Sequence, residues 1–230
     1  MLDGNEAHHL LNVLRLAVRD KIVVVDTAGQ AAIAEIMTVN QGKAILAIVE
    51  KLAENREAPI EIVLAQGLTK SDKMDYIVQK ATELGIKAII PFAADESVVK
   101  YEIGKQQSRQ MRWQKIAFEA AKQCRRNTVP AVHDVQKLEQ VLQGAGAGTN
   151  IFMLYEGETP LGIKQALIDS QPGSYLIIIG PEGGFSAREV TLSKAKGAQL
   201  VTMGPRILRT ETAAVAALSI VMYHQGDLGG

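Results

Sequence analysis

The chain has 230 residues, 47% of them hydrophobic and 22% charged, a balance typical of soluble globular proteins. It contains no run of eighteen apolar residues, and its first ten residues lack the basic and apolar segments of a secretory signal, so neither a membrane span nor secretion is expected. Cys124 is the only cysteine, which excludes an intrachain disulfide and favours a reducing compartment. The formal net charge of zero argues against a nucleic-acid partner unless basic residues gather locally.

Residues 1–57 predict a small β-rich domain. Residues 6–16 have a short helical pattern, in which apolar side chains recur at helical spacing. Three runs separated by turn residues then predict strands over residues 21–26, 31–39 and 43–50. Strands this short and this close together suggest a small barrel or a curled sheet. The polar stretch 54–59 is the expected linker to a second domain.

Residues 58–230 alternate between strand and helix patterns. Strands are expected over residues 60–65, 87–92, 150–154, 174–179 and 199–203. Helices are expected over residues 71–84, 106–126, 135–142, 161–168, 186–196 and 210–224. This alternation predicts an α/β domain with a mostly parallel sheet, and the continuous apolar run 175–179 suits a central strand covered on both faces.

A glycine-rich motif, Ile179-Gly180-Pro181-Glu182-Gly183-Gly184, directly follows that apolar strand. Glycines let a backbone turn tightly and approach a ligand, and ligands of open α/β sheets bind beyond the carboxyl ends of strands. Ser186 and Glu189 have the spacing of a capping box at the start of the next helix. The motif is neither a Walker A loop nor Gly-x-Gly-x-x-Gly, so a dinucleotide-binding enzyme loses support. A turn that only joins strand to helix remains the alternative.

A second motif, residues 203–214, also follows a strand and opens a helix. It places Arg206, Arg209 and Glu211 beside apolar residues, and an acidic group is favourable at a helix start. Two arginines and a carboxylate are unusual in a simple connection, which suggests a site. The alternative is an ion pair on the surface.

A basic face is predicted on the helix over residues 106–126. Its cations recur at spacings of three, four or seven and share one side: Arg109, Arg112, Lys115, Lys122 and Arg126. From Lys100 to Arg126 there are eight Lys or Arg and two Asp or Glu, a local basic excess. This face can bind RNA, or it can simply be solvated. The adjacent His8 and His9 have no zinc-ligand spacing, so no metal site is predicted.

Together these motifs resemble the RsmE family of ribosomal RNA uridine N3-methyltransferases over nearly the whole chain. The matching segments are His9 with Val13-Leu14-Arg15, Lys73-Met74-Asp75, Gln79 to Gly85, Arg112-Trp113, Glu119-Ala120-Ala121, Ile179 to Phe185 and Arg206 to Ala213. The last two motifs, in this order, are the most specific.

The resemblance implies an α/β SPOUT methyltransferase domain with a C-terminal deep trefoil knot over residues 58–230. A PUA-like barrel for RNA binding is implied over residues 1–57. Family members have a further strand before the His9 region, so the barrel can lack its first strand here. The resemblance also implies S-adenosylmethionine as cofactor, a homodimer, a cytoplasmic location without a membrane partner, and 16S ribosomal RNA of the small subunit as substrate.

Site residues carry over by motif. The cofactor pocket is expected at Leu154, Glu156, Gly157, Ile179, Gly180, Pro181, Glu182, Gly183, Gly184, Met203, Gly204, Ile207, Leu208, Thr212 and Ala213. The catalytic candidates are Arg209, which would stabilise negative charge on the uridine, and Glu211, which would orient Arg209 or take the N3 proton. The expected RNA contacts are His9, Arg15, Lys73, Arg112 and Arg126.

Two positions depart from the family pattern, since Arg19 and Arg125 stand where glycine is common. Two other functions stay open alongside the methyltransferase. One is a non-catalytic RNA-binding module with a degenerate methyltransferase domain, which the intact motifs oppose. The other is a SPOUT methyltransferase that acts on a different RNA.

Overall fold

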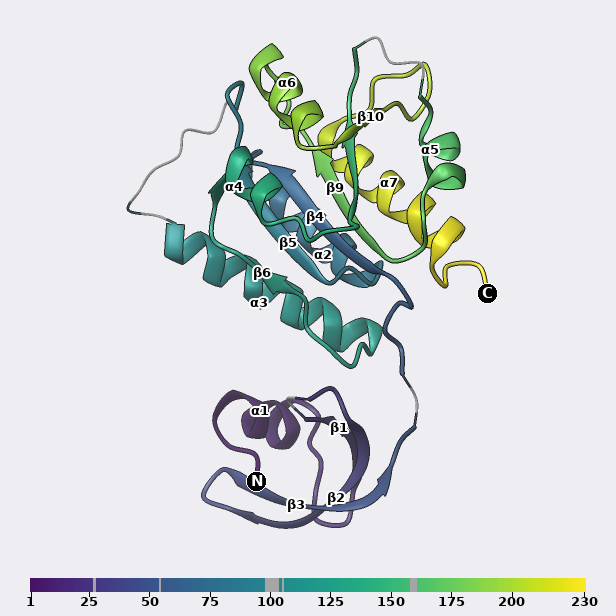
Figure 1. Ribbon diagram of the computed structural model, residues 1–230. Coiled ribbons are helices and arrows are strands. Elements are labelled where there is room, and N and C mark those ends of the chain that lie inside the picture. The colour runs from purple at the N-terminus through teal and green to yellow at the C-terminus, as the bar shows by residue number, and fades with distance from the viewer. Residues whose placement is uncertain (27, 54, 98–103, 105, 158–160) are drawn as a thin grey trace. The chain divides into compact units, whose positions relative to one another are not determined.

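The computed structural model describes residues 1–26, 28–53, 55–97, 104, 106–157 and 161–230. It divides the chain into two compact units, Met1–Arg56 and Glu57–Gly230 (Figure 1). Glu54 of the expected linker, and Lys100 and Lys105 of the expected basic segment, lie outside the described residues. Within the described ranges, no helix combines the length and apolar character needed to cross a bilayer.

The N-terminal unit contains one antiparallel sheet and one short helical segment. Helix α1 (Gly4–His8) continues into a π-helix, η1 (His9–Val13), which ends just before Arg15 takes a positive φ of 55°. The sheet has the order β1-β2-β3, with bounds β1 (Lys21–Val25), β2 (Ala31–Asn40) and β3 (Lys43–Lys51). Two register shifts between β2 and β3 curl this sheet around a small core of Leu10, Ile36 and Ala44.

The C-terminal unit is built on a seven-stranded sheet in which every strand pairing is parallel. Its order is β10-β8-β9-β4-β5-β6, and β7 also pairs with β5. The bounds are β4 (Glu61–Gly67), β5 (Ala88–Ala93), β6 (Ala131–Val132), β7 (Gln136–Lys137), β8 (Asn150–Leu154), β9 (Ser174–Ile179) and β10 (Gln199–Val201). The prediction of a central apolar strand is confirmed, because β9 lies between β8 and β4 and is almost wholly buried.

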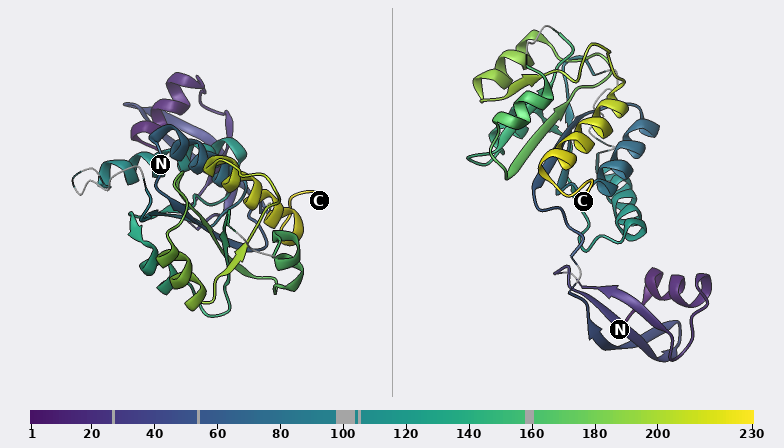
Figure 2. Two further views of the ribbon diagram at one scale, coloured as in Figure 1. Left: turned by 90° about the horizontal axis from the view of Figure 1, so that it is seen from above. Right: turned by 90° about the vertical axis from the view of Figure 1, so that its right-hand side faces the viewer.

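Helices cover both faces of this sheet (Figure 2). One face carries α2 (Ser71–Glu83), α3 (Gln106–Cys124), α5 (Ile163–Asp169) and α7 (Thr210–Gln225). The other carries α4 (Leu138–Gln143) and α6 (Ala187–Ala195). Alternate residues of β4 serve the two cores, with Ile62 and Leu64 in the first and Ala65 in the second.

Local signals set several helix ends. The predicted capping box of Ser186 and Glu189 forms at the start of α6. Gly85 follows α2 with a φ of 86°, as expected for a residue just past a helix end. Helix α3 stops at Cys124, two residues earlier than predicted, because Arg125 takes a left-handed φ of 60° and Arg126 N donates to Ala121 O.

Candidate active site

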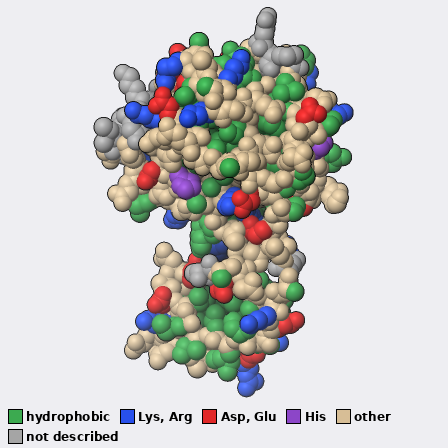
Figure 3. Space-filling view, in the orientation of Figure 1, with side chains coloured by type: hydrophobic (Ala, Val, Ile, Leu, Met, Phe, Trp, Pro, Cys, Tyr) green, Lys and Arg blue, Asp and Glu red, His purple; other side chains and the backbone are tan. Residues whose placement is uncertain are grey.

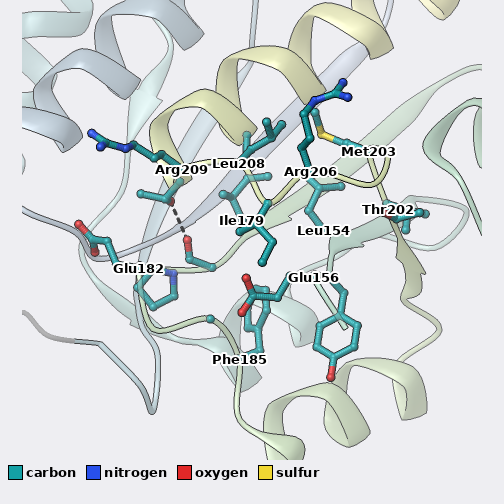
Figure 4. Close-up of a pocket in the computed structure, with 18 of the residues that line it drawn as sticks. Leu154, Glu156, Ile179, Glu182, Phe185, Thr202, Met203, Arg206, Leu208 and Arg209 are labelled. Carbon is teal, nitrogen blue, oxygen red and sulfur yellow. Dashed lines mark hydrogen bonds between the residues drawn. The ribbon is translucent and has the colours of Figure 1, made fainter. Parts of the chain in front are cut away.

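Three neighbouring strands, β8, β9 and β10, end at the same edge of the parallel sheet, so the loops that follow them converge. Between these loops lies a cavity of about 540 Å³ (Figure 4). Cavities that hold cofactor-sized ligands have volumes of about 300 to 1,000 Å³. The cavity lies where ligands of open α/β sheets bind, beyond the carboxyl ends of the strands.

Most residues expected at the cofactor pocket line this cavity. They are Leu154, Glu156, Ile179, Gly180, Pro181, Glu182, Gly184, Met203, Gly204, Ile207, Leu208 and Ala213. Three expected residues do not line it. Gly157 packs under the ring of Tyr155, Gly183 packs on the backbone of Glu96, and Thr212 lines a shallower hollow between α2 and α7.

Sequence reasoning missed several lining residues, among them Phe185, Thr202 and Thr210. Each stands within or next to a segment that the motifs already marked, and that adjacency was the only signal in the sequence. Glu156 points toward the cavity interior, between Ile179 and Phe185 (Figure 4).

Close backbone packing holds the glycine-rich loop against the end of β4. A Cβ atom on Gly67 would lie 2.6 Å from Pro181 Cδ, so no side chain fits at this position. Gly184 has a φ of 75°, a conformation that L side chains rarely adopt. These two glycines let the loop of residues 180–184 turn beside the strand end.

An ion cluster lies at the mouth of the cavity, centred on Lys73 of α2. Lys73 Nζ is 2.9 Å from Glu182 Oε1 and 3.4 Å from Glu211 Oε2. The Thr69 hydroxyl also donates to Glu182 Oε1. The structure thus places Lys73, which was expected to contact RNA, between two carboxylates.

The charges of this cluster follow from its contacts. The hydrogen bond to Glu182 raises the pKa of Lys73, so this side chain is a cation and not a proton acceptor. Burial raises the pKa of Glu182, but the hydrogen bonds from Thr69 and Lys73 outweigh burial and hold that pKa below its ordinary value.

The two catalytic candidates stand at the start of α7. Arg209 is the N-cap and is exposed, and among the described residues its guanidinium has no ion-pair partner. It points away from the cavity interior, on the side of Glu182 (Figure 4). Glu211 pairs with Lys73 rather than with Arg209, and its Oε2 atom is buried without a hydrogen bond from any described residue. Glu211 therefore does not orient Arg209 in this structure.

The remaining RNA candidates differ in accessibility. His9 and Arg15 are exposed on the N-terminal unit, and Arg112 is exposed on α3, where it pairs with Asp75. Arg126 is 9% exposed. Its guanidinium donates to the Glu57 carboxylate and to the backbone oxygens of residues 82 and 86, so it is committed to the fold and not free to meet RNA.

Basic side chains do not form one continuous patch on the visible face of the C-terminal unit. Lys and Arg side chains alternate there with Asp and Glu (Figure 3), in keeping with the zero net charge. Two exposed arginines, Arg206 and Arg209, nevertheless stand on the rim of the cavity. The basic character at the site therefore comes from these two arginines and not from an extended basic surface.

The family models for an RNA methyltransferase domain and for an RNA methyltransferase PUA domain match residues 56–222 and 2–54. The fold and the site therefore define an RNA methyltransferase domain preceded by a PUA domain.

Relatives narrow this class. Ribosomal RNA small subunit methyltransferase E of Bacillus subtilis is 41% identical, over 100% of this chain and 91% of the relative. The crystal structure of a ribosomal RNA small subunit methyltransferase E from Neisseria gonorrhoeae bound to S-adenosyl methionine is 31% identical, with a TM-score of 0.88, over 99% of this chain and 92% of that chain. A structure from Legionella pneumophila with the bound cofactor SAM is 32% identical, with a TM-score of 0.87, over 99% and 92% of the two chains. The chain belongs to the ribosomal RNA small subunit methyltransferase E family.

Proposed function

We propose that this protein transfers the methyl group of S-adenosylmethionine to N3 of a uridine in 16S ribosomal RNA of the small subunit. The observation that carries the proposal is the convergence of both specific motifs, residues 179–185 and 206–213, on one cavity with an exposed arginine at its rim. Membership of the family and the cofactor-bound relatives support the same reaction.

The cavity fits this cofactor in size and in lining. The loops after Leu154, Ile179 and Met203 would present backbone N–H and C=O groups to its polar edges, while Ile179 and Leu208 would cover its apolar faces. When bound, S-adenosylmethionine supplies an electrophilic methyl group on its sulfonium, and the neutral thioether formed on transfer is a good leaving group. The protein then has to align the uridine and handle one proton.

We assign that proton chemistry to the start of α7. Uridine N3 carries a proton and is a poor nucleophile until that proton is removed. Glu211 accepts this proton, directly or through water, and Arg209 stabilises the negative charge that develops on the base. Arg209 has no competing acidic partner among the described residues, which leaves it available to the substrate. Lys73 anchors the carboxylates of Glu182 and Glu211.

We propose the finer features of the fold and of its assembly on the family resemblance. Residues 1–57 form a PUA-like barrel that binds RNA through His9 and Arg15, both exposed. Residues 58–230 form the SPOUT domain, with a deep trefoil knot in which the C-terminal segment threads through a loop. The enzyme is a homodimer, acts in the cytoplasm, and takes its RNA as part of the small subunit.

The proposal is tested by methyl transfer from labelled S-adenosylmethionine to small ribosomal subunits from cells that lack this methyl group, with mass spectrometry of the modified nucleoside. N3-methyluridine is the expected product. Methylation of another RNA only would move the activity to a different substrate. Cofactor binding without transfer to any RNA would favour a non-catalytic module, and absence of cofactor binding would overturn the proposal.

A further inference from the structure

A buried polar relay runs from Gln66, behind the wall of the cavity, to two residues that line it, Thr210 and Gly180. The Gln66 side chain, 0% exposed at the end of β4, donates from Nε2 to Thr210 Oγ1 over 2.9 Å. Thr210, 7% exposed, donates from the same hydroxyl to Gly180 O over 2.7 Å, the bond drawn as a dashed line in Figure 4. The relay joins β4, the glycine-rich loop and the first residue of α7.

The direction of each hydrogen bond in this relay is fixed by chemistry. A carbonyl oxygen such as that of Gly180 can only accept, so the Thr210 hydroxyl must donate to it. The Thr210 oxygen must then accept from Gln66, which has to present its NH2 group. The second hydrogen of this NH2 group donates to Gly67 O over 3.0 Å.

This arrangement leaves one polar atom unsatisfied. Within the described residues, Gln66 Oε1 is buried and has no hydrogen-bond partner. A buried acceptor without a partner destabilises a fold, and an apolar side chain at position 66 would avoid that cost. An amide at this position therefore serves something other than packing alone.

The relay connects the parts of the site that must be aligned. Thr210 stands between Arg209 and Glu211, the proposed catalytic pair, and Gly180 belongs to the loop that lines the cofactor cavity. We propose that Gln66 is a positioning residue. Through the Thr210 hydroxyl, it fixes the Gly180 loop against the first turn of α7 and so sets where Arg209 and Glu211 stand relative to the bound cofactor. This inference rests on the proposed function.

Three variants of the full chain isolate the relay. Thr210→Val removes the hydroxyl and keeps the shape, Thr210→Ser keeps the hydroxyl, and Gln66→Met removes the amide. The matched control is Thr82→Val, because Thr82 is also buried and its hydroxyl donates to Val78 O within α2. Three quantities are measured for each protein: the melting temperature, the calorimetric affinity for S-adenosylmethionine, and the rate of single-turnover methyl transfer at saturating cofactor.

We expect Thr210→Val and Gln66→Met to slow single-turnover transfer by about 100-fold, because small misplacements of reacting groups have effects of this size. Cofactor affinity should fall by up to about tenfold, as for the loss of one hydrogen bond. Melting temperatures should fall no further than in Thr82→Val, and Thr210→Ser should recover most of the rate. A protein that carries both Thr210→Val and Gln66→Met should be no slower than the slower of the two single variants, because both residues act through one relay.

A Thr210→Val protein that transfers methyl groups as fast as Thr82→Val would overturn the inference. If Thr210→Val does not fold, Gln66→Met decides by the same comparison. A wild type that binds cofactor but transfers nothing would instead overturn the proposed function. In that case the calorimetric affinities decide on the relay, and equal affinity in Thr210→Val and Thr82→Val counts against it.

Discussion

Arg209 and Arg126 show how differently two arginines of one chain are used. Arg126 is buried and bonded to Glu57 and to backbone oxygens, whereas Arg209 is exposed on the rim of the cavity, with no acidic partner among the described residues. A guanidinium without a partner stays available to an incoming charge. A guanidinium that satisfies buried carbonyls contributes to stability.

We predict that removing the Arg209 side chain slows methyl transfer without weakening cofactor binding. Arg209→Ala should lower single-turnover methyl transfer by about 100-fold or more, the effect of removing one donor to a developing negative charge. Calorimetric affinity for S-adenosylmethionine should stay close to that of the wild type. The control is Arg206→Ala, because Arg206 is an exposed arginine on the same loop. This substitution should weaken RNA binding more than it slows methyl transfer at saturating RNA and cofactor. A normal rate in Arg209→Ala would exclude its assigned role.

For Glu57 we predict a pH-dependent loss of stability. Burial raises the pKa of this carboxyl, but hydrogen bonds from Arg126 and Thr128 outweigh burial and hold the pKa below its ordinary value. The charge of Glu57 therefore stabilises the fold fully at pH values above the pKa in the unfolded chain, about 4.3. This stabilisation is lost as the pH falls through the lower pKa of the folded state. Glu57→Gln should reduce the free energy of unfolding by about 2 kcal/mol at pH 7, and the difference should shrink on acidification.

Urea denaturation from pH 7 to pH 3 measures this difference. Glu61→Gln is the matched control, since its ion pair with Lys87 is 56% exposed on both sides, and it should cost less than about 1 kcal/mol. A Glu57→Gln defect that is as large at pH 3 as at pH 7 would show that the charge of Glu57 is not its cause.

At the scale of elements, the end of α3 is strained by its sequence. Arg125 adopts a φ of 60° and Arg126 N bonds back to Ala121 O, a helix ending that glycine suits better than any other residue. Arg125→Gly should raise the free energy of unfolding by about 0.5 to 1 kcal/mol. Lys115→Gly, at an exposed interior position of the same helix, should lower it by about 1 kcal/mol. Chemical denaturation of both variants checks the opposite signs.

The same elements show what the sequence could predict. Signals confined to a few neighbouring residues were correct, such as the Ser186 capping box and the apolar run of β9. Strands β6 and β7 have two residues each, too few to carry a pattern. The early end of α3 was missed because the left-handed residue there is an arginine.

Contacts between distant segments could not be predicted. Nothing in the sequence indicates that Lys73 pairs with Glu182, because the two residues are 109 positions apart. Gln66 and Thr210 are 144 positions apart, and Gln66 belongs to none of the motifs that the sequence analysis identified. Most residues expected at the cofactor pocket do line one cavity, because two of its loops follow strands and carry recognisable motifs.

At the scale of the whole molecule, the two units have separate cores. We therefore predict that residues 57–230 alone fold and bind S-adenosylmethionine with the affinity of the full chain. If the N-terminal unit supplies RNA contacts through His9 and Arg15, its removal should weaken RNA binding by at least about tenfold and reduce the salt dependence of binding. Calorimetry with cofactor and filter binding with ribosomal RNA at several salt concentrations measure the two effects. Unchanged RNA affinity would place recognition in the C-terminal unit.

The strand order of the large sheet also has a consequence for biosynthesis. Strand β4 is made early, but one of its two neighbours, β9, is made about 110 residues later, and the final wall of the site comes with α7 at the end of the chain. At synthesis rates of about 5 to 20 residues per second, the edge of β4 waits about 5 to 20 s for this partner. The nascent chain thus exposes an apolar strand edge for seconds, and its dependence on chaperones should be greatest in that interval.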